Sequence, residues 1–221
     1  MLDPRALPWR GIARTVAAVA LIALVGALGV LNPPRRAGVF TDRLGPERGE
    51  QVADYLVRAR DSLTGPEGVQ HWALLSFTEP LTPERIPDHG GGVRIAQVLY
   101  RVPIPRVQTP LVAVPVPEDI GAAVDSADYA AWLLPSPADD RSARTVAVSA
   151  TRLRAGCACV IGLVVRGPLA NLRHLAAQNG VRAVQALPAD AVAGRFGVVP
   201  LLPDQLEVVQ PGPDDGPVPD R

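Results

Sequence analysis

The most hydrophobic stretch of the chain runs from Ile12 to Leu31, and Arg14 is its only charged residue. A helix of about 20 apolar residues spans the roughly 30 Å hydrocarbon core of a bilayer. Asn32 and two prolines follow, and they would end such a helix. We therefore predict a transmembrane helix over residues 12–32. A cleaved signal peptide is the alternative, because basic residues precede the apolar stretch and small residues within it would suit a cut.

The distribution of arginine around this segment favours a cytoplasmic N-terminus. Three arginines precede the apolar residues or lie at their start, and two follow them closely. We expect a single-pass protein of the cell membrane, held by a signal-anchor. The expected parts are a cytoplasmic N-terminus at 1–11, a stalk at 33–45, an extracytoplasmic domain at 46–206 and a disordered tail at 207–221.

The polar and apolar pattern after the stalk alternates between helical and strand periods. It predicts helices over 46–63, 119–134, 139–155 and 168–180. It predicts strands over 71–77, 93–103, 111–117, 157–167 and 181–187. The prolines within 111–117 place that strand at a sheet edge, because proline lacks the N–H that a central strand needs.

Residues 72–99 and 160–187 share one pattern of apolar strand, Pro-Leu, helical stretch, Gly, Val-Arg and apolar strand. Each segment has the size of a βαβ unit, whose right-handed crossover would give its two strands the same direction. Two such units predict an α+β fold, a small ferredoxin-like βαβ-repeat sandwich with residues 118–155 as a helical insertion. A chance similarity between the two segments is the alternative.

Composition narrows the function classes. The 22 basic residues are all arginine and balance 22 acidic residues, so net charge gives no support for binding nucleic acid. The chain has no lysine, which excludes a Schiff-base lysine and a phosphate-binding-loop lysine. No serine lies in a Gly-x-Ser-x-Gly motif. The sequence therefore predicts no catalytic residue and no cofactor.

Cys157 and Cys159 are the only thiols of the chain. Residues two apart on a strand point to the same face, so their sulfur atoms would be neighbours. Three interpretations remain open: two buried core residues, a disulfide formed outside the cytoplasm, or a redox or soft-metal site for an ion such as Cu(I).

The other chemically versatile residues form no recognisable site. They are His71, His89 and His174, the glycines at 90–92, and the acidic pairs Asp139-Asp140 and Asp214-Asp215. The histidines are far apart in sequence. The glycines lack an accompanying lysine and are typical of a turn. Adjacent carboxylates are typical of solvated segment ends rather than of an acid–base pair.

Two resemblances extend this interpretation. The segment LRHLAAQNGVRAVQAL at 172–187 resembles the closing helix and strand of subtilisin-type propeptide inhibitors, which implies a ferredoxin-like shape. The wider layout resembles single-pass, membrane-anchored proteins of high-GC Gram-positive bacteria. Its shared features are GEQVADYLVRAR at 49–60, the Cys-x-Cys pair and PLLPDQ at 200–205. That second resemblance implies a membrane location and no specific activity.

Together these features predict a non-enzymatic, membrane-anchored envelope protein whose α+β domain binds another envelope or membrane protein. One alternative is an extracytoplasmic redox or copper-handling protein that uses Cys157 and Cys159. A propeptide-like protease inhibitor is the other alternative.

Overall fold

The computed structural model describes residues 19–21, 42–117 and 120–220. The chain divides into two compact units, Met1–Val39 and Phe40–Arg221. In the first unit, residues 19–21 are helical, and the rest of the predicted span at 12–32 lies outside the described residues. None of the helices in the described ranges combines the length and hydropathy needed to cross a membrane.

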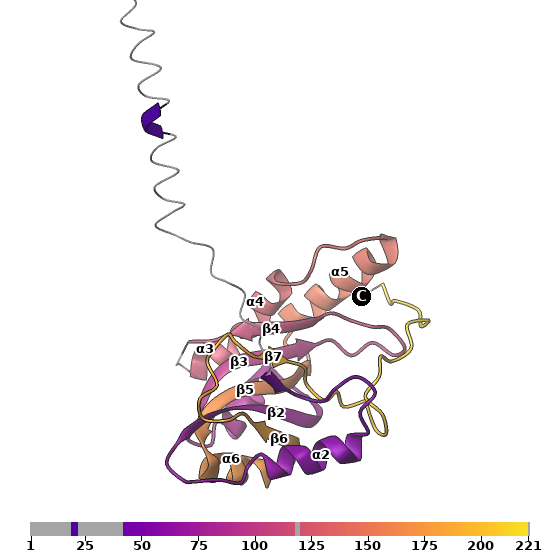
Figure 1. Ribbon diagram of the computed structural model, residues 1–221. Helices are drawn as coiled ribbons and strands as arrows, with labels where there is room; N and C mark the ends of the chain where they lie inside the picture. The colour runs from indigo at the N-terminus through magenta and orange to yellow at the C-terminus, as the bar shows by residue number, and fades with distance from the viewer. Residues whose placement is uncertain (1–18, 22–41, 118–119, 221) are drawn as a thin grey trace, which may run out of the picture. The chain divides into compact units, whose positions relative to one another are not determined.

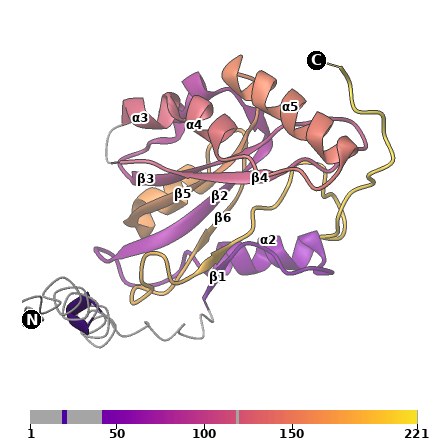
Figure 2. The ribbon, with the colours of Figure 1, turned by 90° about the horizontal axis from the view of Figure 1, so that it is seen from above.

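The second unit is an α+β domain built on a five-stranded antiparallel sheet, in agreement with the predicted class (Figures 1 and 2). The strand order is β4-β3-β5-β2-β6. The strands are β2 (Gln70–Leu81), β3 (Arg94–Arg101), β4 (Leu111–Pro115), β5 (Val160–Pro168) and β6 (Val181–Ala186). The strand predicted at 111–117 is β4, which ends at Pro115 and lies at an edge as expected.

The two similar segments interlock within this sheet. Strands β2 and β3 are joined through the 3-10 helix η1 (Pro83–His89), run in the same direction, and lie on either side of β5. Strands β5 and β6 are joined through α6 (Leu169–Ala176) and lie on either side of β2. Each unit therefore places its strands parallel, with one strand of the other unit between them.

The insertion between β4 and β5 forms three helices. They are α3 (Ile120–Val124), α4 (Ser126–Trp132) and α5 (Asp140–Arg154). The first two occupy the range predicted as one helix and are separated at Asp125, the N-cap of α4. Helix α5 matches its prediction closely. Its N-cap Asp139 forms a capping box with Ser142, and Gly156 follows its end with a φ of +69°.

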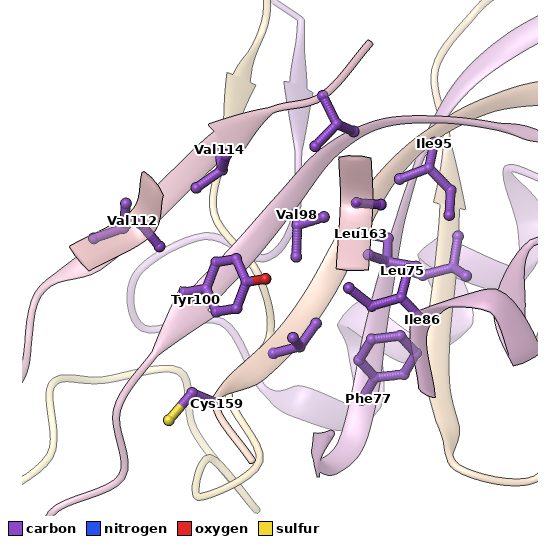
Figure 3. Packing of buried hydrophobic residues seen from close by; sticks show 14 of the residues in the cluster. Leu75, Phe77, Ile86, Ile95, Val98, Tyr100, Val112, Val114, Cys159 and Leu163 are labelled. Atoms are coloured by element: carbon purple, nitrogen blue, oxygen red, sulfur yellow. The ribbon is translucent and has the colours of Figure 1, made fainter. Parts of the chain in front are cut away.

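Both faces of the sheet are covered, so strand β2 is apolar at consecutive positions. Ala73, Leu75 and Phe77 belong to the main core. Figure 3 shows Leu75 and Phe77 in this core together with Tyr100 and Leu163. The intervening residues of β2 face a smaller core on the opposite side. That second core contains Leu44, Leu74, Leu99, Ile161, Val164 and Leu187. A third cluster joins the helix at 52–61 to the C-terminal segment and contains Val52, Tyr55, Ala59, Ala183, Leu201 and Val209.

The predicted stalk and tail boundaries differ from the structure. Residues 43–44 form β1 (Arg43–Leu44), which pairs with β7 (Gly197–Val198), and Leu44 is fully buried. The domain therefore begins before residue 46. Helix α2 (Val52–Asp61) starts six residues later than expected, because the residues before it hydrogen-bond to the segment at 207–209.

The segment predicted as a disordered tail also packs on the domain. Val209 is 5% exposed, and its backbone N–H donates to the carbonyl oxygen of Glu50 at 2.9 Å. Further hydrogen bonds extend to Gly216. Figures 1 and 2 show the end of this segment beside α5. Residues 207–220 thus belong to the folded domain, without regular secondary structure of their own.

Candidate binding groove

A groove of about 520 Å³ opens at one end of the sheet. Its walls come from the end of β2, the end of β3 with the following loop, the start of β5 and the C-terminal segment. The lining residues are Pro80, Arg101, Pro103, Ile104, Pro105, Arg106, Val107, Ile161, Pro203, Asp204, Gly212 and Pro213. Segments that are far apart in sequence therefore meet at this one place.

Five of these lining residues are prolines, which gives the groove its physical character. The proline ring fixes φ and removes the backbone donor, so such a wall is apolar and loses little conformational entropy when a ligand binds. Ile104, Val107 and Ile161 add buried aliphatic surface. The groove is suited to apolar side chains of a partner with a preformed shape.

The charged groups of the groove are two arginines and one aspartate. Arg101 is 17% exposed at its side chain and lies 3.3 Å from the carboxylate of Asp204. Arg106 has a φ of +55°, which is uncommon for a residue other than glycine, and it forms an ion pair with Asp215. The lining residues that the structure describes include no His, Cys, Ser, Thr or Tyr. The groove therefore combines apolar walls with charged groups at which a polar ligand group could bind.

Residues 212–216, which we call the C-terminal strap, border this groove. The carboxylate of Asp214 accepts from the backbone N–H of Gln108 at 3.0 Å and from the guanidinium of Arg141 at 3.2 Å. These two donors lower the pKa of Asp214 below its ordinary value of 3.8, the Gln108 N–H having the larger effect. The carboxylates of the pair Asp214-Asp215 are thus exposed to solvent, as expected, and are also bonded to the domain.

The remaining contacts of the strap are made through its backbone. The side-chain amide of Gln108 donates to the carbonyl oxygen of Gly212 at 2.7 Å. The N–H of Gly216 donates to the carbonyl oxygen of Arg106 at 2.8 Å. Arg141 also donates to the carbonyl oxygen of Gly216 at 2.9 Å. The strap thus joins the loop between β3 and β4 to the first turn of α5.

A second, smaller cavity of about 240 Å³ lies on the other side of this contact. Its lining includes Gln108, Arg141 and Asp214, together with residues that lead into α5. Asp214 lines this cavity, whereas the two preceding residues line the groove. The strap therefore runs between the two hollows.

Cys157 and Cys159 are joined by a disulfide, with their Cα atoms 5.3 Å apart. Both residues precede β5 instead of lying on it, so the expected placement on a strand is wrong. Cys159 is fully buried in the main core near Tyr100 (Figure 3). Its carbonyl oxygen accepts from the backbone N–H of Arg101 at 2.9 Å. The disulfide thus fixes the chain next to two lining residues of the groove, Arg101 and Ile161.

The three histidines are not among the residues that line this groove. His71 donates through Nδ1 to the carbonyl oxygen of Leu187 at 2.8 Å. His89 contacts the side-chain oxygen of Gln178 at 2.9 Å, and His174 lies in the last turn of α6. Within the described ranges, no group of three or more His, Cys, Asp or Glu side chains is placed to hold a metal ion.

Two sequence interpretations agree with the local structure. The glycines at 90–92 form a turn, in which the N–H of Val93 donates to the carbonyl oxygen of Gly90 at 2.8 Å. Asp139 caps α5, and the backbone N–H of Ser142 is the main cause of its lowered pKa. Arg106, Gln108 and Arg141 were not identified from the sequence. The only local signal was the Asp214-Asp215 pair, which has no visible partner until the chain is folded.

No protein-family model matches the chain, and searches of curated proteins and of solved structures found no match.

Proposed function

We propose that the chain is a membrane-anchored envelope protein whose α+β domain binds another protein through the proline-lined groove. The groove is the observation that carries this proposal, because its lining is mostly apolar and its proline walls are rigid. The apolar sequence at 12–31 supports the anchor. The disulfide supports an extracytoplasmic domain, because such bonds persist in oxidising compartments.

We also infer a ferredoxin-like topology for the domain. The order β3-β5-β2-β6, with antiparallel neighbours, is the order of a βαββαβ sandwich, and η1 would take the place of its first helix. Strand β4 and helices α3 to α5 would then be the insertion. NOEs between Leu75 and Leu163 would support this order, whereas direct pairing of β2 with β3 would contradict it.

Topology is tested with a tag placed after residue 221 in the full chain. Protease added to intact spheroplasts should remove the tag and leave a membrane-bound fragment. Protection of the tag, with cleavage only after lysis, would place the domain in the cytoplasm and contradict the proposed location.

The groove is tested by photo-cross-linking in living cells. A photoreactive residue at Pro105, which is exposed in the groove wall, should form a discrete protein adduct. The control is the same residue at Val57, which is 53% exposed on α2 and does not line the groove. The proposal is wrong if both positions give the same adducts, or if Pro105 gives none.

The disulfide favours one alternative function, thiol–disulfide exchange. Cys157 is only partly buried, so its sulfur is the more accessible one for attack by an external thiolate. The reaction would join that thiolate to Cys157 and release the thiolate of Cys159. Copper binding would need both thiols in reduced form. A disulfide that equilibrates with glutathione would support a redox role, and one that stays intact in the folded protein would exclude it.

A further inference from the structure

The C-terminal strap meets the domain as a ligand meets a receptor. Two guanidinium groups, from Arg106 and Arg141, and the backbone N–H of Gln108 converge on the adjacent carboxylates of Asp214 and Asp215. The donors come from the loop between β3 and β4 and from α5, so they belong to the folded domain rather than to the strap. Two positive guanidinium groups on the domain thus face two negative carboxylates on the strap.

We propose that the strap is an intramolecular ligand of this site, and that its ligand in trans is an acidic, proline-flanked segment of a partner protein. The inference rests on the proposed protein-binding function. It adds the chemistry of the recognised segment and a way of regulating access to the groove.

At Gly216 the backbone of the strap lies so close to the backbone of residues 105–106 that it fixes which residue of the strap can occupy this position. A Cβ atom added at Gly216 would lie 2.5 Å from the carbonyl oxygen of Pro105 and 2.9 Å from that of Arg106. Backbone atoms on the receptor side cannot move away as a flexible side chain can. The site therefore selects a segment with glycine immediately after the two aspartates, which is a sequence preference and not only a charge preference.

The attachment is built to be exchangeable. The side chains of Arg106 and Asp215 are 61% and 64% exposed, and those of Arg141 and Asp214 are 37% and 47% exposed. Ion pairs in contact with water contribute little individually and are weakened by salt. Val218, which follows the strap, packs only partly buried against the main core. A segment held in this way can be displaced by a competing segment with the same groups.

Displacement would also change the groove. Gly212 and Pro213 form part of its wall, and Asp214 lines the neighbouring cavity. A partner segment that replaced the strap could therefore extend its flanking residues into the proline-lined groove. The bound strap limits this extension, which makes it an autoinhibitory contact.

The test uses the full chain in lipid nanodiscs and a fluorescent peptide with the sequence of residues 210–220. Fluorescence anisotropy measures the affinity. In the wild-type chain the strap competes at a high effective concentration. Gly216→Ala expels the strap sterically and leaves all the receptor donors in place, so it should bind the peptide at least about tenfold more tightly than wild type. Gly197→Ala is the matched control, because its Cβ would meet nothing within 4 Å, and it should bind as wild type does.

A change in the peptide tests whether its aspartates are the groups that the site recognises. Replacing the aspartates at positions 214 and 215 of the peptide with asparagine, while keeping the one at 220, should weaken its binding to the Gly216→Ala chain at least about tenfold. Should Gly216→Ala fail to fold, the full chain carrying Asp214→Asn and Asp215→Asn serves instead, because it too releases the strap and keeps the receptor. No gain in affinity over wild type, or equal binding of the asparagine peptide, would overturn the proposal.

The peptide-binding experiment and the cross-linking experiment at Pro105 can fail independently of each other. Cross-linking at Pro105 without peptide binding would leave a protein-binding groove and make the strap a structural element. Peptide binding without a cross-link in cells would leave the acidic-segment site and remove the groove as the site of partner binding.

Discussion

The backbone N–H of Gln108 donates to a carboxylate oxygen of Asp214 across 106 residues of sequence. This bond is made to the loop that follows β3, and Arg106 in the same loop forms the wall of the groove. A change in the charge of Asp214 should therefore be detected at the groove, which leads to the first prediction.

Acid should release the strap only below the ordinary pKa of an aspartate. The pKa of Asp214 is lowered in the folded state, so its contribution to strap binding is complete above about pH 3.8 and is lost as the pH falls through the lowered value. The NMR resonance of the Gly216 amide, which is bonded to Arg106, reports the bound strap. Asp214→Asn should shift the resonance toward the released position at neutral pH, whereas Asp190→Asn should not. A midpoint well above pH 4 would contradict this assignment.

Breaking the disulfide should destabilise the domain modestly. Cys157→Ala removes the bridge while Cys159 still fills its buried site. The two cysteines are only two residues apart, so the loss of free energy of unfolding should be small, roughly 1–2 kcal/mol. Thermal denaturation measures the loss, and intact mass of the wild-type protein checks that two hydrogens are missing. Two alkylatable thiols in the native wild-type protein would refute the bond.

Alkaline pH should destabilise the domain through buried tyrosine. Burial raises the pKa of Tyr100 to about 12, and burial also raises the pKa of Tyr55. A raised pKa in the folded state gives stability that is present below about pH 10 and is lost as the pH rises toward the folded value. Urea denaturation at about pH 8 and about pH 11 should show this loss.

The substitution Tyr100→Phe separates the contribution of the Tyr100 hydrogen bond from that of Tyr100 ionisation. It removes the 2.8 Å hydrogen bond to Ser126 and should cost about 1 kcal/mol at neutral pH. The variant should also lose less stability than wild type between the two alkaline conditions, because only Tyr55 remains to ionise from the core. An unchanged alkaline slope would show that Tyr100 does not govern it.

The close approach of the paired strands β5 and β2 leaves no room for a side chain at Gly162. A Cβ atom there would lie 2.4 Å from the carbonyl oxygen of Leu75 on the neighbouring strand. Gly162→Ala should therefore cost about 1–3 kcal/mol of unfolding free energy. Gly197→Ala, which meets open space, should stay within about 0.5 kcal/mol of wild type. Chemical denaturation of both variants compares them directly, and equal midpoints would contradict the steric argument.

Local sequence patterns were sufficient to predict most helices and strands of the domain. Strands β2 and β5 stand out in the sequence because both of their faces are buried, and the edge position of β4 follows from its prolines. The N-cap and the following glycine also marked α5 correctly. These features depend on residues close together in the chain.

The errors arose where distant segments decide the structure. Pro46 and Glu50 suggested an early helix start, but residues 49–52 bond to residues 207–209 instead. The composition of the C-terminal segment suggested disorder, yet its aspartates meet Arg106 and Arg141. Neither pairing leaves a periodic signal in a single sequence, so the groove and the strap could not be located from it.

The pairing of β1 with β7 also has a mechanical consequence. The N–H groups of Gly197 and Val199 donate to the carbonyl oxygens of Asp42 and Leu44, and the two strands run parallel. A pull on the chain before Asp42, opposed by a load on the residues after Val199, would act along these strands from opposite ends. The hydrogen bonds and the buried Leu44 would then resist in shear and yield together. Tension applied at Asp42 and at Val199 would thus load this small parallel pair directly, whereas tension at the C-terminal end would first meet the strap and residues 207–209.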